Sequence, residues 1–355
     1  MFYFVNLFIL LMYSWVFKIF KIKHRMYFII TAIHIGGIIA FRSCYTGTDT
    51  YQYYNAYKML ISYDGNISEL TKMYAKFPGW AVFFKAVSSV CGRNPNIYMF
   101  VTGYFIVIVI WIAIELLEVD LKQAIVLYYL IFALQAMNIA RQNMALCLLF
   151  LSAALFIKGK KIFSIFFLAF AVSIHTSAII GVPVLLVLSM NWTRRRVYYA
   201  IGVSVIALLS VNILFNIFTN SFAGYSSYLL GVYKATGRNV VMQIIYALTF
   251  LYAMWIPKRY DLPAEKEQLL LKGSVLLWGE LLLGVFFSTE ILIARENLYL
   301  QIFIIILVPV VTSYFNKYRI FYKFIVYGMV LFYFSYRIMS NYGSIIPYQT
   351  YLFER

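Results

Sequence analysis

Long apolar stretches follow one another along almost the whole chain, separated by short polar or basic segments. Most are roughly 15 to 23 residues long, close to the length that a helix needs to span a bilayer. They lack the alternation of apolar and polar residues that is typical of outer-membrane barrel strands. A helix satisfies its own backbone hydrogen bonds in lipid, so we predict helices. The predicted spans are 2–20, 26–42, 97–117, 123–140, 142–157, 161–175, 176–190, 197–218, 240–256, 269–288, 291–314 and 319–340.

Composition agrees with this pattern. Hydrophobic residues make up 63% of the 355 positions, charged residues only 12%, and the mean hydropathy is +0.81. That is too little polar surface for a water-soluble domain of this size. We therefore predict an all-α polytopic integral membrane protein with about twelve transmembrane helices. Residues 1–355 are expected to form a single membrane domain, with an outer loop of interfacial or re-entrant helices at 43–96.

Several function classes lack support. The three cysteines show no metal-binding or redox spacing, and no nucleotide-binding loop, zinc motif or serine-nucleophile elbow is present. The net charge of +17 is dispersed along the chain, which makes a nucleic-acid partner the weaker explanation. Basic cytoplasmic loops explain it better.

Those basic loops predict the orientation of the helices. Clusters at 18–25 and 158–161 should both be cytoplasmic, so an even number of crossings must separate them. Five apolar segments lie between the two clusters, and the weakest is 78–92, which carries Lys85 in its middle. We predict that 78–92 is an interfacial or re-entrant helix. The alternative is that 123–157 forms one long broken crossing. In the first case both termini face outward.

Four costly side chains fall on the outward side of this topology. A charge in the middle of a bilayer costs about 3 kcal/mol or more, so such residues usually face a cavity or a partner. An arginine at a helix end can instead extend to the headgroups, and a histidine can simply cap a helix. Asn138, Arg141 and Gln142 are expected to share one helix face at i, i+3 and i+4. The four outward residues are Arg42, Arg141, His175 and Arg295.

The hairpin 161–190 places His175 below the outer surface. Each of its helices is about 22 Å long at 1.5 Å per residue. That is shorter than the hydrocarbon core of roughly 30 Å. A recessed imidazole near recessed arginines suggests a cavity that opens outward, where a low dielectric strengthens contacts with an anionic ligand.

The first outer loop predicts a short helix. Asp49 followed by Gln52 fits a capping box, so we expect a helix at about 50–62. Gly47 allows the turn before it. Tyr51, Tyr54 and Tyr57 would then lie near one face. They could anchor the interface or form a platform for sugar rings, and composition does not choose between these.

Taken together, these motifs resemble a known family. The chain is similar to the EpsG family of Wzy-type polysaccharide polymerases, which build exopolysaccharide, O-antigen or capsule from repeat units. Arg295 with Tyr299, and Pro347-Tyr348, resemble weaker features of the C-terminal half of the family. The main motifs, in the family's order, are Arg42-x4-Gly47-Thr48-Asp49-x-Tyr51-x2-Tyr54, Arg141-Gln142-x2-Ala145 and His175-x-Ser177-Ala178.

The resemblance implies a GT-C-like membrane glycosyltransferase that needs no cofactor, metal or nucleotide sugar. It would act at the outer leaflet of the bacterial cytoplasmic membrane on oligosaccharide units linked to undecaprenyl pyrophosphate. The growing glycan would move to the next lipid-linked unit, releasing undecaprenyl pyrophosphate. The partners it suggests are membrane lipid and the flippase and chain-length regulator of the same pathway.

This chemistry assigns hypothetical roles to the outward residues. The catalytic base would be His175 or Asp49, with His175 preferred because Asp49 fits a helix cap. Substrate contacts would come from Arg141 and Arg295 with the pyrophosphate, Gln142 beside them, Arg42 as a structural or phosphate contact, and Tyr51 and Tyr54 with sugars. Three alternatives remain open: a transporter or flippase of lipid-linked sugars, a glycan ligase that uses the same donor, and, less favoured, a membrane acyltransferase.

Overall fold

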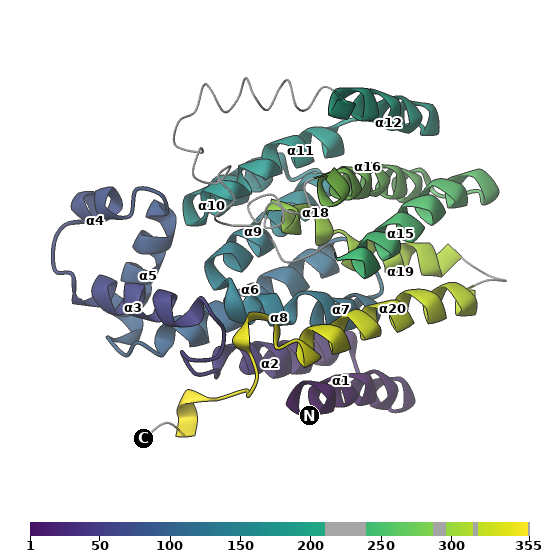
Figure 1. Ribbon diagram of the computed structural model, residues 1–355. Coiled ribbons are helices and arrows are strands. Elements are labelled where there is room, and N and C mark those ends of the chain that lie inside the picture. The colour runs from purple at the N-terminus through teal and green to yellow at the C-terminus, as the bar shows by residue number, and fades with distance from the viewer. Residues whose placement is uncertain (210–238, 287–295, 315–318, 354–355) are drawn as a thin grey trace. The chain divides into compact units, whose positions relative to one another are not determined.

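The computed structural model describes residues 1–209, 239–286, 296–314 and 319–353 (Figure 1). Within these ranges every regular element is a helix, and β pairing is limited to an isolated antiparallel bridge between Arg42 and Thr350. The chain divides into two compact units, which are described separately. The first contains Met1–Val182 and Val330–Arg355, and the second contains Pro183–Met329.

The first unit is built from helices of very different lengths. The long ones alternate with short ones in the outer loop and in the stretch before residue 140. In chain order they are α1 (Phe2–Ile19), α2 (His24–Ala40), α3 (Thr50–Ser62), α4 (Ile67–Met73), α5 (Pro78–Cys91), α6 (Ile97–Leu116), α7 (Leu121–Ile131), α8 (Ala133–Asn138), α9 (Ala140–Ile157), α10 (Lys161–Ile174), the 3-10 helix η1 (Thr176–Ile180), and the short η3 (Tyr342–Ser344) and η4 (Tyr351–Phe353).

Local chemistry explains several of these helix ends. The Asn66 side chain accepts a hydrogen bond from the Glu69 N–H at 2.8 Å and so caps α4. Asp120 does the same for α7. Pro78 begins α5, where the missing N–H costs nothing, and Gly92 with φ +86° follows its end. The predicted helices at 50–62 and 78–92 are therefore both present.

The second unit contains fewer described helices. They include α12 (Arg194–Leu209), α15 (Val240–Arg259), α16 (Ala264–Phe286), α18 (Leu298–Gln301) and α19 (Ile304–Tyr314). Two helices run across the boundary between the units, α11 (Gly181–Ser189) and α20 (Arg319–Met339). The predicted spans 197–218 and 291–314 lie partly outside the described residues, and so does the end of 269–288.

Five of the described helices are long and apolar enough to cross a membrane: α1, α6, α9, α15 and α16, the last counted to Val285. Other apolar helices, among them α2, α7 and α10, are shorter. The described chain is thus helical with several potential membrane spans, and the count of twelve stays a prediction.

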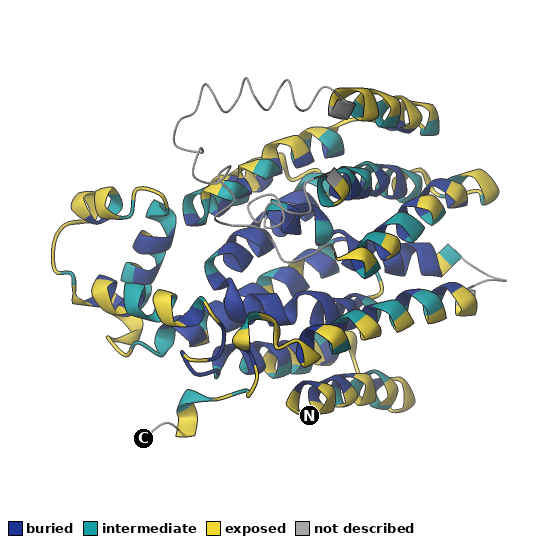
Figure 2. Cartoon of the chain, viewed as in Figure 1, coloured by how far each residue is buried: buried dark blue, intermediate teal, exposed yellow. Residues whose placement is uncertain are grey.

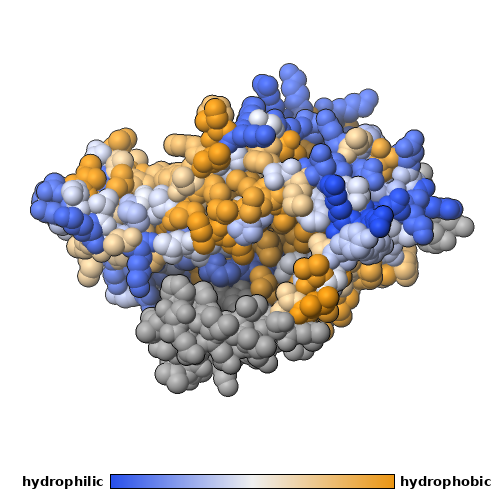
Figure 3. Space-filling view, turned by 90° about the horizontal axis from the view of Figure 1, so that it is seen from above, coloured by the Kyte–Doolittle hydropathy of each residue, from blue (hydrophilic) through white to orange (hydrophobic). Residues whose placement is uncertain are grey.

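Burial separates the packed interior from the outer faces. α8 and α9 are almost completely buried, whereas α1 and α10 each have one exposed face (Figure 2). The exposed face of α10 is apolar: Ile162 is 84% exposed and Phe166 62%. Apolar side chains also gather over the middle of the face drawn in Figure 3. A water-soluble protein rarely leaves so much apolar surface open, but lipid accepts it.

The prediction of one continuous helix over 123–140 is wrong. The segment breaks at Phe132, between α7 and α8, and again at Ile139 (φ −92°, ψ 59°), between α8 and α9. Next to the first break, Arg337 Nη1 donates to the Ile131 carbonyl at 2.8 Å. A cation at a helix C-terminus satisfies a carbonyl that the helix leaves free.

The cysteines offer a test of the predicted topology. Cys91 at the end of α5 is exposed, whereas Cys44 and Cys147 are buried. If 78–92 lies outside, a membrane-impermeant maleimide applied to intact cells should label the protein at one site. The Cys91→Ser variant should lose that label. Labelling of Cys91 only after the cells are opened would contradict the outward placement of this helix.

Candidate functional site

Arg141 lies at the break between α8 and α9. It is the second residue of α9, directly after the non-helical Ile139. Because α9 begins at Ala140, Arg141 lies in its first turn. The N-terminal end of a helix carries the positive end of the helix dipole. The prediction that Asn138, Arg141 and Gln142 share one helix face is wrong, because Asn138 ends α8 before the break. Gln142 is buried in the first turn of α9.

Three aromatic rings surround the Arg141 guanidinium. Its Cζ lies 3.5 Å from the centre of the Phe77 ring, 5.2 Å from that of Tyr53 and 5.6 Å from that of Trp80. We call these rings, with Arg141, the arginine cage. Aromatic faces attract a cation, most strongly where water is excluded. They do not neutralise it, so the charge stays available to an anion.

Acidic residues do not pair with Arg141 in the described chain. The ion pairs found there are His24–Glu115, Arg93–Asp64 and Lys158–Glu118. The Arg141 Nε is buried and has no hydrogen-bond partner. A guanidinium has five N–H donors in a planar fork that matches phosphate oxygens. The arginine cage can therefore bind a phosphate or carboxylate group.

Phe77 connects the arginine cage to His175. The Phe77 ring lies 5.7 Å from the imidazole ring, centre to centre, at an interplanar angle of 30°. α5 reaches this place because Gly79 lets it approach α10 closely: a Cβ on Gly79 would lie 2.0 Å from Ser173 Oγ. The structure thus brings together two residues that the sequence had only placed on the same side of the membrane.

His175 sits at the junction of α10 and η1 with extended backbone geometry. Its Nδ1 lies 2.6 Å from Ser177 Oγ. This contact helps to fix the plane of the imidazole. A base role requires the tautomer in which Nδ1–H donates to the serine oxygen, since Nε2 then carries the lone pair.

The first outer loop is held by two other segments of the chain. Asn138 Oδ1 accepts from Thr48 Oγ1 and from the Asp49 N–H, both at 2.9 Å. The Thr48 N–H donates to the Gly343 carbonyl at 2.9 Å. The Thr50 hydroxyl donates to the Met137 carbonyl at 2.8 Å. The loop, the end of α8 and the C-terminal segment form one hydrogen-bonded junction, which we call the three-segment junction.

The three-segment junction corrects the prediction for Asp49. Asp49 precedes α3 as expected, but its side chain makes no capping hydrogen bond to that helix. Instead its backbone N–H is bound by Asn138, and its carboxylate accepts from Thr48 Oγ1 at 3.3 Å. Asp49 is half-buried. The hydrogen bonds of Asp49 therefore lie within the outer loop and the three-segment junction, and its side chain does not cap α3.

Arg42 is fully buried beside the three-segment junction. One Nη1 donor binds the Ile39 carbonyl, whereas Nε and Nη2 have no hydrogen-bond partner. Tyr98 and Tyr348 interact electrostatically with its guanidinium, and Tyr98 interacts with Arg141 as well. Burial raises the pKa of Tyr348 to about 12, so its phenol stays neutral at physiological pH. Because Arg42 is fully buried, a substrate at the surface of the protein would contact the residues around it and not Arg42 itself.

The tyrosines of α3 divide between two faces. Tyr51 is 47% exposed and stacks on Tyr45 at 5.6 Å between ring centres, while Tyr57 is fully buried. Tyr54 is half-buried, with Lys58 Nζ 5.8 Å from its ring centre. The prediction that Tyr57 shares the face of Tyr51 is therefore wrong. Arg295 lies outside the described residues.

The three rings of the arginine cage were not predicted from the sequence. Tyr53 was hidden among the other tyrosines of the loop. Tyr74, Phe77 and Trp80 recur at intervals of three residues just around Pro78, and this spacing could have marked the segment. The importance of Asn138 for the outer loop also follows only from contacts between distant parts of the chain.

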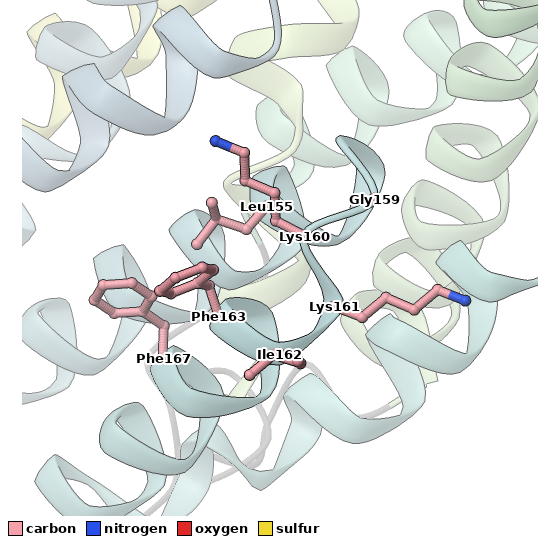
Figure 4. A pocket seen from close by; sticks show the side chains of 7 residues that line it. All are labelled: Leu155, Gly159, Lys160, Lys161, Ile162, Phe163 and Phe167. Atoms are coloured by element: carbon pink, nitrogen blue, oxygen red, sulfur yellow. The ribbon is translucent and has the colours of Figure 1, made fainter.

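A hollow at the opposite end of α10 does not belong to this site. It is lined by apolar side chains together with Lys160 and Lys161, at the turn between α9 and α10 (Figure 4). His175 follows the other end of α10, which is 14 residues long. Groups of three or more acidic, histidine or cysteine residues that could hold a metal are absent from the described chain.

Comparison with protein families gives one result that covers most of the chain. The sequence model of the EpsG family matches residues 25–350. Comparisons with curated proteins and with solved structures find no match.

Gly47 should be essential to the three-segment junction. Its φ is +104°, and an added Cβ would lie 3.0 Å from the Met137 carbonyl oxygen. Gly92 also has positive φ, at +86°, but a Cβ there meets nothing within 4 Å. Gly47→Ala should therefore lose about 1–3 kcal/mol more stability than Gly92→Ala, because it adds a clash to the backbone strain. Thermal unfolding of the purified variants measures this, and equal losses would contradict it.

Proposed function

We propose, from the premise that the chain belongs to the EpsG family, that it polymerises a polysaccharide from lipid-linked repeat units at the arginine cage. The family indicates a membrane polysaccharide polymerase. The substrate in this proposal is an oligosaccharide on undecaprenyl pyrophosphate, and transfer takes place at the outer leaflet of the bacterial cytoplasmic membrane. One observation supports the site above all: the Phe77 ring lies near both the Arg141 guanidinium and the His175 imidazole, and that guanidinium pairs with no acidic side chain among the described residues.

The leaving group explains the need for Arg141. The acceptor hydroxyl attacks the anomeric carbon of the donor sugar, and the bond from that carbon to the pyrophosphate oxygen breaks. Negative charge grows on the pyrophosphate as it leaves. A cation that is already in place stabilises that charge without reorganisation. Arg141 is half-buried, and three aromatic rings lie around its guanidinium.

The acceptor hydroxyl needs a group that takes its proton. His175 is proposed for this role because histidine is the side chain that most often acts as a general base, and its ring lies 5.7 Å from the Phe77 ring of the arginine cage. Asp49 is the second candidate. Its backbone is committed to the three-segment junction, which favours a structural role for this residue.

Sugar contacts are proposed for the surface of α3. Tyr51 and Tyr45 present a stacked pair of half-exposed rings, and Tyr54 lies one turn further along the same helix. The apolar face of a pyranose packs on such rings. Gln142 and Arg42 are both buried, so direct sugar contacts are not proposed for them. Arg295 is kept as a second pyrophosphate ligand on the basis of the sequence alone.

The membrane arrangement proposed here has twelve crossings in one GT-C-like domain. Five described helices have the length and composition of spans, and shorter apolar helices would add to them. The glycan would enter from the aqueous side while the polyprenyl chain stays in lipid. A flippase and a chain-length regulator are the expected partners, and the reaction requires no cofactor.

Arg141→Ala should abolish polymer formation while lipid-linked single units accumulate. Removing one stabilising cation at the leaving group should lower the rate by about 10²–10³-fold. The control is Arg195→Ala, which removes an exposed arginine that also lies over a tyrosine, at 5.4 Å from the ring centre. The measurement is chain growth by the purified protein supplied with lipid-linked units. Long chains made by Arg141→Ala at normal protein levels would refute the role.

The same assay separates the alternative functions. A polymerase yields a ladder of growing chains. A transporter moves the lipid-linked unit across liposomes without any growth, and a ligase transfers the glycan only to a different acceptor. Transport without growth by the wild-type protein would identify a transporter, and transfer only to a different acceptor would identify a ligase. Either result would contradict the polymerase proposal.

Replacing the base should affect the rate more than binding. His175→Ala should reduce the rate of chain growth by about 10²–10⁴-fold at saturating substrate, as expected for loss of a general base. Asp49→Asn keeps the size of the side chain and should leave most of the activity. Should Asp49→Asn be inactive and His175→Ala active, the base is Asp49.

A further inference from the structure

The second unit contains a buried carboxylate that the proposed reaction does not use. Glu280 lies within α16 and is fully buried. Its Oε1 accepts hydrogen bonds from Gln243 Nε2 at 3.0 Å and from Gln301 Nε2 at 3.1 Å. The ion pairs found in the described residues do not include it. A buried charge without a partner is costly, so something is expected to balance it.

Three buried oxygens in this cluster lack a hydrogen-bond partner. They are Glu280 Oε2, Gln243 Oε1 and Asn297 Oδ1. An amide side chain has both an NH₂ donor and a carbonyl acceptor, and in Gln243 and Asn297 only the donor is used. Gln243 turns its NH₂ toward the carboxylate, and Asn297 Nδ2 donates to the Glu280 backbone carbonyl at 3.2 Å. Each amide thereby keeps its carbonyl oxygen free. All three oxygens belong to Glu280 or to side chains that are hydrogen-bonded to it.

We propose that Glu280 Oε2, Gln243 Oε1 and Asn297 Oδ1 bind a monovalent hard cation of the sodium class. One carboxylate and two amide carbonyls are oxygen donors of the kind that hard cations prefer. A single positive charge matches the single negative charge of Glu280. A divalent ion such as Ca²⁺ usually takes six to eight oxygens and several carboxylates, which this cluster does not offer.

A proton serves this cluster less well than a cation. Protonation of Oε2 would supply one donor, which satisfies Oε2 and one amide oxygen and leaves the other amide oxygen alone. A cation held by the three oxygens would satisfy all of them and balance the charge. The proposal concerns the second unit only and does not depend on the polymerase reaction at the arginine cage.

The backbone at this place is suited to an ion. Asn297 directly precedes α18, which has only four residues, and the helix is interrupted at Ile302 and Phe303 before α19 begins. In membrane proteins, interrupted helices commonly supply ion ligands because their ends leave carbonyl groups free. Gly284 allows Gln243 to lie against α16, since a Cβ there would be 2.0 Å from Gln243 Nε2.

Sodium binding to the purified full-length protein tests the proposal. The probe is NaCl, compared with choline chloride at equal ionic strength, with ²²Na⁺ binding and thermal unfolding as the two readouts. Wild type should bind ²²Na⁺ saturably and unfold at a temperature several degrees higher in NaCl, because a ligand that binds only the folded state stabilises it. Glu280→Gln should lose both effects. Glu265→Gln, an exposed change in the same helix, should keep both.

A second variant keeps the test decisive if Glu280→Gln does not fold. Asn297→Ala retains the carboxylate and removes one of the three oxygens, so the half-saturating sodium concentration should rise tenfold or more. The absence of ²²Na⁺ binding and of any difference between NaCl and choline chloride in wild type would overturn the proposal. So would equal loss in Glu265→Gln. Arg141→Ala should bind sodium normally, so failure of the polymerase assignment and failure of this site are distinguishable.

Discussion

The first unit depends on holding positive charge at buried and half-buried positions where the carboxylates of the described residues do not pair with it. Arg141 is held by rings, Arg42 by a carbonyl and neighbouring tyrosines, and Arg337 by the Ile131 carbonyl with its Cζ 3.9 Å from the centre of the Tyr342 ring. Aromatic faces and carbonyl oxygens stabilise a cation while leaving its charge uncompensated. An acidic partner would have stabilised these residues more directly, but it would also have occupied the fork that an anion needs.

Breaks in the helices make this arrangement possible. In a continuous helix over 121–157, the direction of the Arg141 side chain would be fixed by the helical repeat of the preceding residues. The breaks at Phe132 and Ile139 instead let α8 end at Asn138, whose side chain binds the outer loop. They also let α9 begin at Ala140, so that Arg141 in its first turn lies beside three aromatic rings. The free backbone groups at the breaks are satisfied by side chains from distant segments. In a membrane protein, irregular backbone is tolerated only where it is buried in protein in this way.

The second unit holds an acidic side chain in a buried position. Oε1 of the Glu280 carboxyl group accepts hydrogen bonds from two amide donors, whereas Oε2 has none. Amide groups supply donors but each also brings an oxygen of its own. Satisfying one carboxylate oxygen with amides therefore creates new unsatisfied oxygens nearby. A bound cation would balance that excess of acceptors.

Hydropathy alone determined that the chain is helical and has several potential membrane spans, because backbone hydrogen bonding in lipid permits few other structures. The sequence also predicted the helix at 50–62, and the resemblance of its motifs predicted the EpsG family, whose model matches residues 25–350. It could not predict the ring of Phe77 between Arg141 and His175, or the binding of the outer loop by Asn138. Those contacts join residues that are dozens of positions apart. Local patterns specify which helix a residue joins, but only packing decides which distant side chains meet and which charges remain without a partner.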